Sequence, residues 1–238
     1  MNEFIFFSHL LVNLTFLLGA LRFGKKTLIV FFVLESILAN LFVLKQISLF
    51  GLTVTASDVY VVGAILALNL IQEYFGKEEA KKAVIMTFFG LSLFLVMSQF
   101  QLYYLPSKVD YAAAAYAQIL KVMPRLLVFS VMVFLVAQKV DLEIFSFLKK
   151  RFSQNFLLRL SGAALISQTI DTVLFSFLAL YGVVANLFHV IAVSLVIKYL
   201  LVFTSASLIV FLKKMKVVEI KKIAKTEKIV GTEYEENS

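Results

Sequence analysis

The sequence predicts an all-α integral membrane protein, a bundle of six to seven transmembrane helices. Of its 238 residues, 61% are hydrophobic and only 16% are charged, and the mean hydropathy is +0.93. A soluble globular domain is about half apolar and about a quarter charged. Such an excess of apolar surface cannot be hidden in a core of this size, so it requires lipid. The length allows about six or seven helices of roughly 20 residues, with no separate soluble domain.

Seven apolar runs define the expected membrane spans. They cover residues 4–21, 27–44, 59–75, 83–105, 123–138, 157–181 and 183–212. The alternating pattern of a transmembrane barrel does not appear in them. Because every backbone N–H and C=O must be paired internally in hydrocarbon, the runs are expected to be helices. The last run is long for one span, and could be a tilted helix or a helix followed by an interfacial stretch.

The distribution of basic residues predicts the orientation. Clusters of Lys and Arg lie on alternate loops, namely Arg22, Lys25 and Lys26, then Lys77, Lys81 and Lys82, then Lys139, Lys149, Lys150, Arg151 and Arg159, and finally Lys213, Lys214 and Lys216. By the positive-inside rule, seven spans with the N-terminus outside and the C-terminus in the cytoplasm put every cluster on one side. We therefore assign the net charge of +8 to these loops rather than to a nucleic-acid partner.

One domain followed by a tail is expected. Residues 1–212 form a single transmembrane helical domain, and residues 213–238 form a charged cytoplasmic tail that is interfacial or disordered. Within the first, residues 46–58 include a β-favouring stretch and could form an outer-face or re-entrant loop. Ser57 and Asp58 suit the N-cap of the next helix, and Pro124 suits the first turn of the fifth helix.

Several functional classes lack support in the sequence. The chain has no Cys and two His, which leaves no thiol chemistry and little for a transition-metal site. The catalytic and nucleotide-binding motifs of hydrolases, metalloproteases and P-loop proteins are absent. We therefore expect no catalytic residue, no metal and no cofactor. Transport would be facilitative, driven by a gradient, or powered by another subunit's ATPase.

The sixth and seventh runs contain ionisable residues at depth. Asp171 lies near the middle of the sixth run, shares a face with Gln168 and Phe175, and is followed by Thr172. A carboxylate beside an amide and an aromatic ring suits a planar, hydrogen-bonding ligand. Lys198, in the middle of the seventh run, is the expected cation for Asp171. The alternative is a purely structural ion pair that braces two helices, since intramembrane charges are expensive and pair with one another.

A second group of polar residues ends the third and fifth runs. Asn69 and Glu73 share one helical face, and Gln138 and Asp141 stand three apart at the matching depth. They could form a gate near the inner face, or they could be interfacial residues, with Glu73 paired to Lys77 four residues on. The residues alone favour the interfacial interpretation.

Arg125 falls at the outer boundary of the fifth run. It could snorkel outward into the headgroup layer or close the outer mouth of a polar cavity. In the second run, Glu35 and Asn40 are secondary candidates.

Three stretches of the chain resemble the queuosine precursor transporter family (the VUT family). The first runs from Leu68 to Lys77, with an acidic helix end followed by aromatic-Gly-Lys, and continues as Ala80-Lys81-Lys82. The second is Arg125 opening a span that ends Ala137-Gln138-Lys139-Val140-Asp141, with Phe145 beyond it. The third is Ser167-Gln168-Thr169-Ile170-Asp171-Thr172, and Lys198 falls where the family tends to carry a Lys. The resemblance covers about residues 30 to 212.

The resemblance implies uptake of 7-deazaguanines across the bacterial cytoplasmic membrane for tRNA modification. The cargo would be 7-cyano-7-deazaguanine, 7-aminomethyl-7-deazaguanine or queuine. On this interpretation Asp171 accepts the two donors of the guanine-like edge. Gln168, Gln138 or Arg125 then reaches the carbonyl, and Phe175 stacks on the ring. Asn69 departs from the Asp common in the family.

The expected partners are a small-molecule 7-deazapurine and the lipid bilayer, with no nucleic acid; assembly into a homo-oligomer is left open. Two other functions stay open at this stage. The chain could be a substrate-binding membrane subunit resembling the vitamin-binding components of energy-coupling-factor systems, which need a separate ATPase module. It could also be a structural membrane subunit whose polar residues only brace the bundle.

Overall fold

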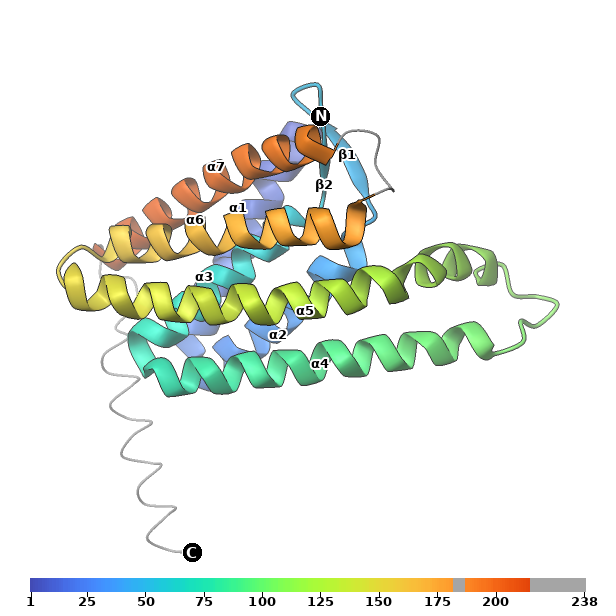
Figure 1. Ribbon diagram of the computed structural model, residues 1–238, viewed down its shortest axis with the longest axis horizontal. Coiled ribbons are helices and arrows are strands. Elements are labelled where there is room, and N and C mark those ends of the chain that lie inside the picture. Colours follow the sequence, from blue (N-terminus) through green and yellow to red (C-terminus); the bar gives the residue numbers. More distant parts are fainter. Residues whose placement is uncertain (182–186, 215–238) are drawn as a thin grey trace, which may run out of the picture.

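The protein is a helical bundle with one small β-hairpin (Figure 1). The computed structural model describes residues 1–181 and 187–214, without the side chains of residues 52–55, 122–123, 127, 180, 189, 205–206 and 208–214. Its elements in chain order are α1 (Asn2–Phe23), α2 (Lys25–Phe42), β1 (Gln46–Leu49), β2 (Leu52–Thr55), α3 (Asp58–Phe75), α4 (Lys77–Tyr103), α5 (Ala113–Arg151), α6 (Phe156–Phe175), the π-helical turn η1 (Ser176–Leu180) and α7 (Leu187–Lys214).

The helices have the length and composition of membrane spans. Within the described residues, four are long and apolar enough to cross a bilayer, namely α1, α3, α4 and α6 continued to Ala179, and the bent helix α5 makes a fifth. The helix α2 carries Lys25, Lys26 and Glu35, and the apolar part of α7 in this measure is 190–204. The predicted class, a helical multi-pass membrane protein, is confirmed.

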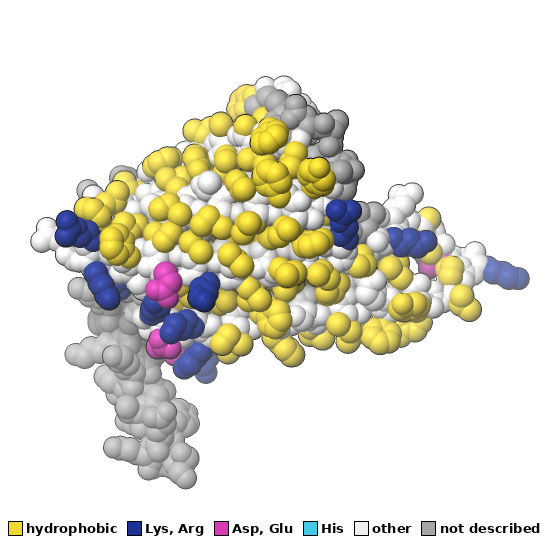
Figure 2. Space-filling view, viewed as in Figure 1, with side chains coloured by type: hydrophobic (Ala, Val, Ile, Leu, Met, Phe, Trp, Pro, Cys, Tyr) yellow, Lys and Arg dark blue, Asp and Glu magenta, His cyan; other side chains and the backbone are white. Residues whose placement is uncertain are grey.

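The central helix of the bundle is α3. It is buried along most of its length, and it packs against α1, α2, α4, α5, α6 and α7. The outer helices bury one side and leave apolar side chains such as Phe16, Ile85 and Phe89 exposed. Figure 2 shows hydrophobic side chains covering the visible flank of the bundle, with charged ones gathered toward its ends. This is the distribution that lipid-facing helices require.

Two glycines make the sharp connections between consecutive helices. Gly24 joins α1 to α2 with φ 104°, and Gly76 joins α3 to α4 with φ 96°. A residue with a Cβ rarely adopts such a conformation. Each glycine therefore ends one helix and begins the next without a loop.

The basic loops meet at one end of the bundle, which we call the basic end. Lys25 at the start of α2 lies 3.2 Å from Glu79 near the start of α4, and Lys77 lies 2.7 Å from Glu143 on α5. These contacts join connections that are far apart in sequence. The expectation that the clusters after the first, third and fifth runs share one side of the bundle agrees with this arrangement.

The segment before α3 differs in detail from a re-entrant loop. It forms an antiparallel hairpin in which Leu49 pairs with Leu52 across the turn residues Phe50 and Gly51, both with positive φ. Ser57 occupies the N-cap position of α3, as predicted, but its side chain makes no capping hydrogen bond. Residues 182–186, and all of the predicted tail 213–238 except its first two residues, lie outside the described residues.

The prediction for Pro124 was wrong. The helix α5 begins at Ala113, so Pro124 lies inside it rather than in its first turn. The segments 113–126 and 128–151 meet at 48° close to this proline. A proline inside a helix removes one backbone hydrogen bond and its ring clashes with the preceding turn, which bends the helix.

Candidate functional site

A buried polar cluster lies where α3, α5 and α6 meet. We use this name for Asn69 on α3, Gln138 and Asp141 on α5, and Ser167 and Gln168 on α6. The exposed fraction is 4% for Gln138 and 0% for the other four. Polar side chains inside membrane helices are costly, and they mark a binding or transport pathway or join helices by hydrogen bonds.

Contacts between helices bring Asn69, Asp141 and Ser167 together. The Ser167 hydroxyl donates a 3.0 Å hydrogen bond to Asp141 Oδ1, and the Asn69 amide also faces the Asp141 carboxyl group. Asn69 Nδ2 also donates to the Leu160 carbonyl, at 3.5 Å. The cluster therefore links all three helices.

Asp141 is buried between helices rather than lying at the end of its helix. Because the apolar run ends at residue 138, the sequence alone favoured an interfacial position for Gln138 and Asp141. The helix α5 continues to Arg151, so Asp141 lies well inside the helix and is fully buried. The level of Asp141 on α5 and the level of Gln168 on α6 looked separate in the sequence, and they are adjacent in the fold.

Most members of the cluster have polar atoms without a partner in the described part of the chain. They are Asn69 Oδ1, Gln138 Oε1, Asp141 Oδ2, and both Gln168 Nε2 and Gln168 Oε1. A buried polar atom with no hydrogen bond costs about 1–3 kcal/mol. The carboxylate and the amides offer acceptors, and Gln168 adds a donor, so the set can bind a planar molecule that carries both donors and acceptors.

Asp171 and Lys198 form the predicted ion pair beside this cluster. Lys198 Nζ lies 3.3 Å from Asp171 Oδ2 and donates a 3.1 Å hydrogen bond to Thr172 Oγ1. The Lys198 side chain is 7% exposed and that of Asp171 is 26% exposed. The pair joins α6 to α7 one turn beyond Gln168. Asp171 thus points toward α7, whereas Gln168 is buried in the cluster.

Glu73 does not belong to the cluster, and its predicted pairing with Lys77 is wrong. Its carboxylate lies 2.7 Å from Arg159 Nη2 and 3.3 Å from Lys149 Nζ at the basic end. The prediction assumed one continuous helix from Glu73 to Lys77. Gly76 breaks that helix, so Lys77 opens α4 and pairs with Glu143 instead.

Arg159 is a buried residue that the sequence analysis counted only among the loop charges. It is 5% exposed, and besides Glu73 it donates to the backbone carbonyls of Phe152 and Ser153. The sequence did hold a signal of this burial, because Arg159 lies inside the sixth apolar run rather than before it. A charge within an apolar run is expected to have a partner inside the bundle.

The structure does not bring Arg125 to the cluster. Its side chain is exposed and donates to the Tyr181 carbonyl at 3.5 Å, which links α5 to the end of η1. This contact leaves the Arg125 side chain at the surface of the bundle.

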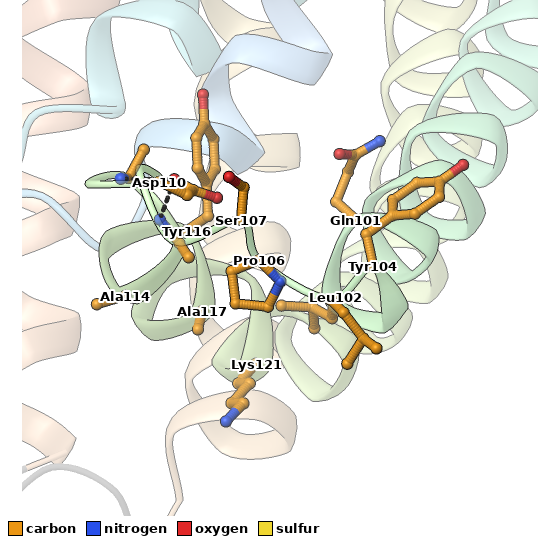
Figure 3. Close-up of a pocket in the computed structure, with 13 residues that line it drawn as sticks. Gln101, Leu102, Tyr104, Pro106, Ser107, Asp110, Ala114, Tyr116, Ala117 and Lys121 are labelled. Atoms are coloured by element: carbon orange, nitrogen blue, oxygen red, sulfur yellow. Dashed lines mark hydrogen bonds between the residues drawn. The ribbon is translucent and has the colours of Figure 1, made fainter.

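A surface cavity lies elsewhere, between the C-terminal end of α4 and the N-terminal end of α5. It has a volume of ≈ 510 Å³ and is lined by the connection between these helices, including Tyr104, Asp110, Tyr116 and Lys121. Figure 3 shows these side chains arranged around the loop, with Asp110 bonded to the start of α5. None of the residues predicted to bind substrate lines it. Its exposed aromatic residues are typical of a membrane–water interface.

Comparisons with known proteins point in one direction. Residues 55–212 match the family model described as "Putative vitamin uptake transporter". Over 187 residues the chain is 33% identical to a Bacillus subtilis protein named "Probable queuosine precursor transporter", covering 76% of this chain and 80% of that protein. No solved structure matches the chain. The matched region contains α3 to α6 and α7 as far as residue 212, and therefore every residue of the buried polar cluster.

Proposed function

Because this chain belongs to the vitamin uptake transporter family, a family of membrane transporters and not of enzymes, we propose that it imports 7-deazaguanine precursors of queuosine. The substrates are 7-cyano-7-deazaguanine, 7-aminomethyl-7-deazaguanine or queuine. The similar Bacillus subtilis protein, named as a queuosine precursor transporter, supports the substrate class. The site chemistry supports it independently.

The buried polar cluster is the observation that carries this proposal. Gln168 is fully buried, and neither atom of its amide has a partner among the described residues. The nearby carboxylate of Asp141 uses Oδ1 to accept from Ser167 and leaves Oδ2 unpartnered. Ligand sites place a small number of polar groups in largely apolar surroundings, and this cluster supplies such polar groups.

The guanine-like edge of a 7-deazaguanine complements these atoms. Its C=O and N1–H form a cis-amide, which pairs with a carboxamide through two hydrogen bonds. Gln168 Nε2 would donate to the carbonyl, and Gln168 Oε1 would accept from N1–H. The exocyclic amine, next to N1–H, would donate to Asp141 Oδ2. Asn69 and Gln138 provide further acceptors, and Phe175 remains the aromatic candidate for stacking.

This assignment moves the carboxylate role from Asp171 to Asp141. Asp171 is engaged by Lys198 at 3.3 Å, so binding an edge with two donors would require it to leave a buried cation. Asp171, Thr172 and Lys198 instead form the wall of the site on the α7 side. A Lys held by two partners there can contact the substituent at position 7 or hold α6 against α7.

The proposed topology follows from the basic end. Seven spans, with α2 and α7 included, would put the N-terminus outside and the basic end in the cytoplasm. Residues 1–212 then form one transmembrane domain in the bacterial cytoplasmic membrane. Glu73, Arg159 and Lys149 would close the cytoplasmic end of the pathway, and Arg125 would lie toward the outside.

Cells that cannot make the precursor and lack their own transporter test this function. Expressing the chain and supplying each base separately should restore queuosine in tRNA, measured by mass spectrometry of digested tRNA. Gln168→Leu should remove most of this restoration at equal protein level, since both amide contacts are lost. Gln118→Leu makes the same change at an exposed position of α5 and should have no effect.

Purified protein in liposomes separates the proposal from the energy-coupling-factor alternative. The proposed transporter moves labelled base without a partner protein. Binding of the base without any sustained transport would favour a substrate-binding subunit that needs an ATPase module. If the protein neither binds nor transports any of the three bases, the proposed function is wrong.

A further inference from the structure

A second buried carboxyl group lies outside the proposed substrate site, where α1, α2 and α3 meet. Glu35 of α2 is 5% exposed and accepts a 2.6 Å hydrogen bond from Asn13 Nδ2 of α1. The two residues lie near the middles of their helices. Gly63 of α3 faces them so closely that a Cβ added there would lie 2.5 Å from Glu35 Oε2 and 2.8 Å from Asn13 Oδ1. Three helices therefore pack directly around one carboxyl group.

Among the described residues, no cation pairs with Glu35 to balance a negative charge. The ion pairs of the described residues do not include it. Asn13, itself 6% exposed, also has an unpartnered Oδ1 beside the carboxyl group. A buried carboxylate without a cation is strongly disfavoured, whereas a bound proton neutralises it and supplies a donor. That donor is what Asn13 Oδ1 lacks.

The other ionisable groups around Glu35 do not supply the positive charge that a bound proton would supply. Tyr60, one turn before Gly63 on α3, is close enough to interact electrostatically with Glu35, and the His9 ring of α1 lies 4.7 Å from the Tyr60 ring. Asp58 lies farther along, at the start of α3. The neighbouring helix α4 has no ionisable residue between Ala83 and Leu102, and α5 has none between Leu126 and Gln138.

We propose that Glu35 is a proton-binding site that couples proton entry to substrate transport. With the proton bound, the neutral carboxyl group packs against Asn13 and Gly63 and holds α1, α2 and α3 together. When the proton leaves, the charged carboxylate must reach water, which favours separation of α2 from α3. Because α3 also carries Asn69 of the buried polar cluster, the rearrangement reaches the substrate site. The coupling rests on the proposed transport function, whereas the proton site does not.

Proteoliposomes loaded at different internal pH test the coupling. Uptake of labelled 7-cyano-7-deazaguanine by the wild-type protein should rise several-fold under an inward proton gradient. Glu35→Gln, which imitates the protonated side chain, should lose this stimulation and retain exchange of internal for external base. Glu78→Gln, at an exposed residue of α4, serves as the control and should keep the stimulation. Unchanged stimulation in Glu35→Gln, or exchange by the wild type without any stimulation, would overturn the inference.

Infrared spectroscopy tests the proton site without substrate. The carbonyl stretch of a protonated carboxyl group should be lost on raising the pH of the wild-type protein, and Glu35→Gln should lack part of this change. An identical difference spectrum in both proteins would contradict the proposal. If the wild type neither binds nor transports any of the bases, the proposed function fails, and this spectrum still decides whether Glu35 binds a proton.

A third measurement needs no variant, in case Glu35→Gln does not fold. Hydrophobic carbodiimides react with protonated carboxyl groups in apolar surroundings. Peptide mass spectrometry of treated wild-type protein should locate the label on Glu35, with less label as the pH is raised. Label that is absent from Glu35, or independent of pH, would contradict the proposal.

Discussion

The Ser167 hydroxyl donates a 3.0 Å hydrogen bond to Asp141 Oδ1, joining α6 to α5 inside the bundle. Both residues are fully buried. This bond fixes which carboxylate oxygen is engaged and which, Oδ2, is left to bind the substrate amine in our proposal.

Ser167→Ala should therefore weaken binding without abolishing folding. The lost bond to a carboxylate costs about 1–3 kcal/mol, and the freed Oδ1 lets the carboxylate rotate. We expect a lower temperature of thermal unfolding in detergent and a roughly tenfold weaker affinity for 7-cyano-7-deazaguanine, the equivalent of about 1.4 kcal/mol. Ser130→Ala changes a hydroxyl that bonds Asn40 at 2.5 Å, about three turns before Asp141 on α5. Ser130→Ala should lower stability without lowering affinity. An equal loss of affinity in both variants would argue against a specific role for Ser167.

Gly63→Ala should destabilise the bundle, because the new Cβ would lie 2.5 Å from Glu35 Oε2. Overpacking of this kind costs about 1–3 kcal/mol, which should appear as a lower unfolding temperature. A matched control is Gly19→Ala on α1, where an added Cβ meets nothing within 4 Å. That change should be neutral or slightly stabilising, because alanine favours a helix over glycine.

A second variant identifies the cause of the Gly63 effect. Glu35→Ala removes the carboxyl group that the new Cβ meets, so Gly63→Ala should cost less in a Glu35→Ala background than in the wild type. Equal costs in the two backgrounds would show that Gly63 is crowded by something other than Glu35.

Removal of Lys198 should be more harmful than removal of the whole ion pair. Lys198→Ala leaves Asp171 without its cation, and breaking one side of a buried pair costs about 3–5 kcal/mol, an upper bound here because Asp171 is partly exposed. Adding Asp171→Ala should restore the amount of folded protein in the membrane, measured by fluorescence-detected gel filtration. Uptake should stay low in the double variant because the wall of the site is altered. Full recovery of uptake would show that the pair only braces α6 against α7.

Glu73→Gln should destabilise the basic end, because Arg159 is buried and would lose its 2.7 Å partner. Glu143→Gln breaks a pair of the same length with Lys77, but there the Glu143 side chain is 62% exposed. Exposed pairs contribute little, so this control should unfold at nearly the wild-type temperature. Equal unfolding temperatures for the two variants would refute a stabilising role for the Glu73–Arg159 contact.

The apolar pattern of the sequence was sufficient to place most helices. The predicted run 59–75 and the observed helix Asp58–Phe75 nearly coincide, because an apolar stretch between polar loops has few alternatives in a bilayer. The helix α5 was less predictable. Hydropathy falls at Lys139, yet the helix continues to Arg151 because its charged extension is still stabilised by packing on α6.

Some contacts of the candidate site were predicted from the sequence and others were not, again depending on where the helices end. Lys198 and Asp171 could be paired from sequence because opposite charges inside apolar runs seek each other. The partner of Glu73 could not, since the prediction depended on a helix that Gly76 interrupts. The burial of Asp141 was not predicted, because the apolar run ends three residues before it. Only the contact with Ser167 brings it to the level of Gln168.

The most direct test of the proposed site pairs a change in the ligand with a change in the protein. Titration calorimetry would compare 7-cyano-7-deazaguanine with its analogue lacking the exocyclic amine. The wild-type protein should bind the analogue at least about tenfold more weakly, because Asp141 Oδ2 is then left unpaired. In Asp141→Leu, the two ligands should bind with equal, reduced affinity. If Asp141→Leu still discriminates between them as the wild type does, Asp141 does not bind the amine and the proposed site is wrong.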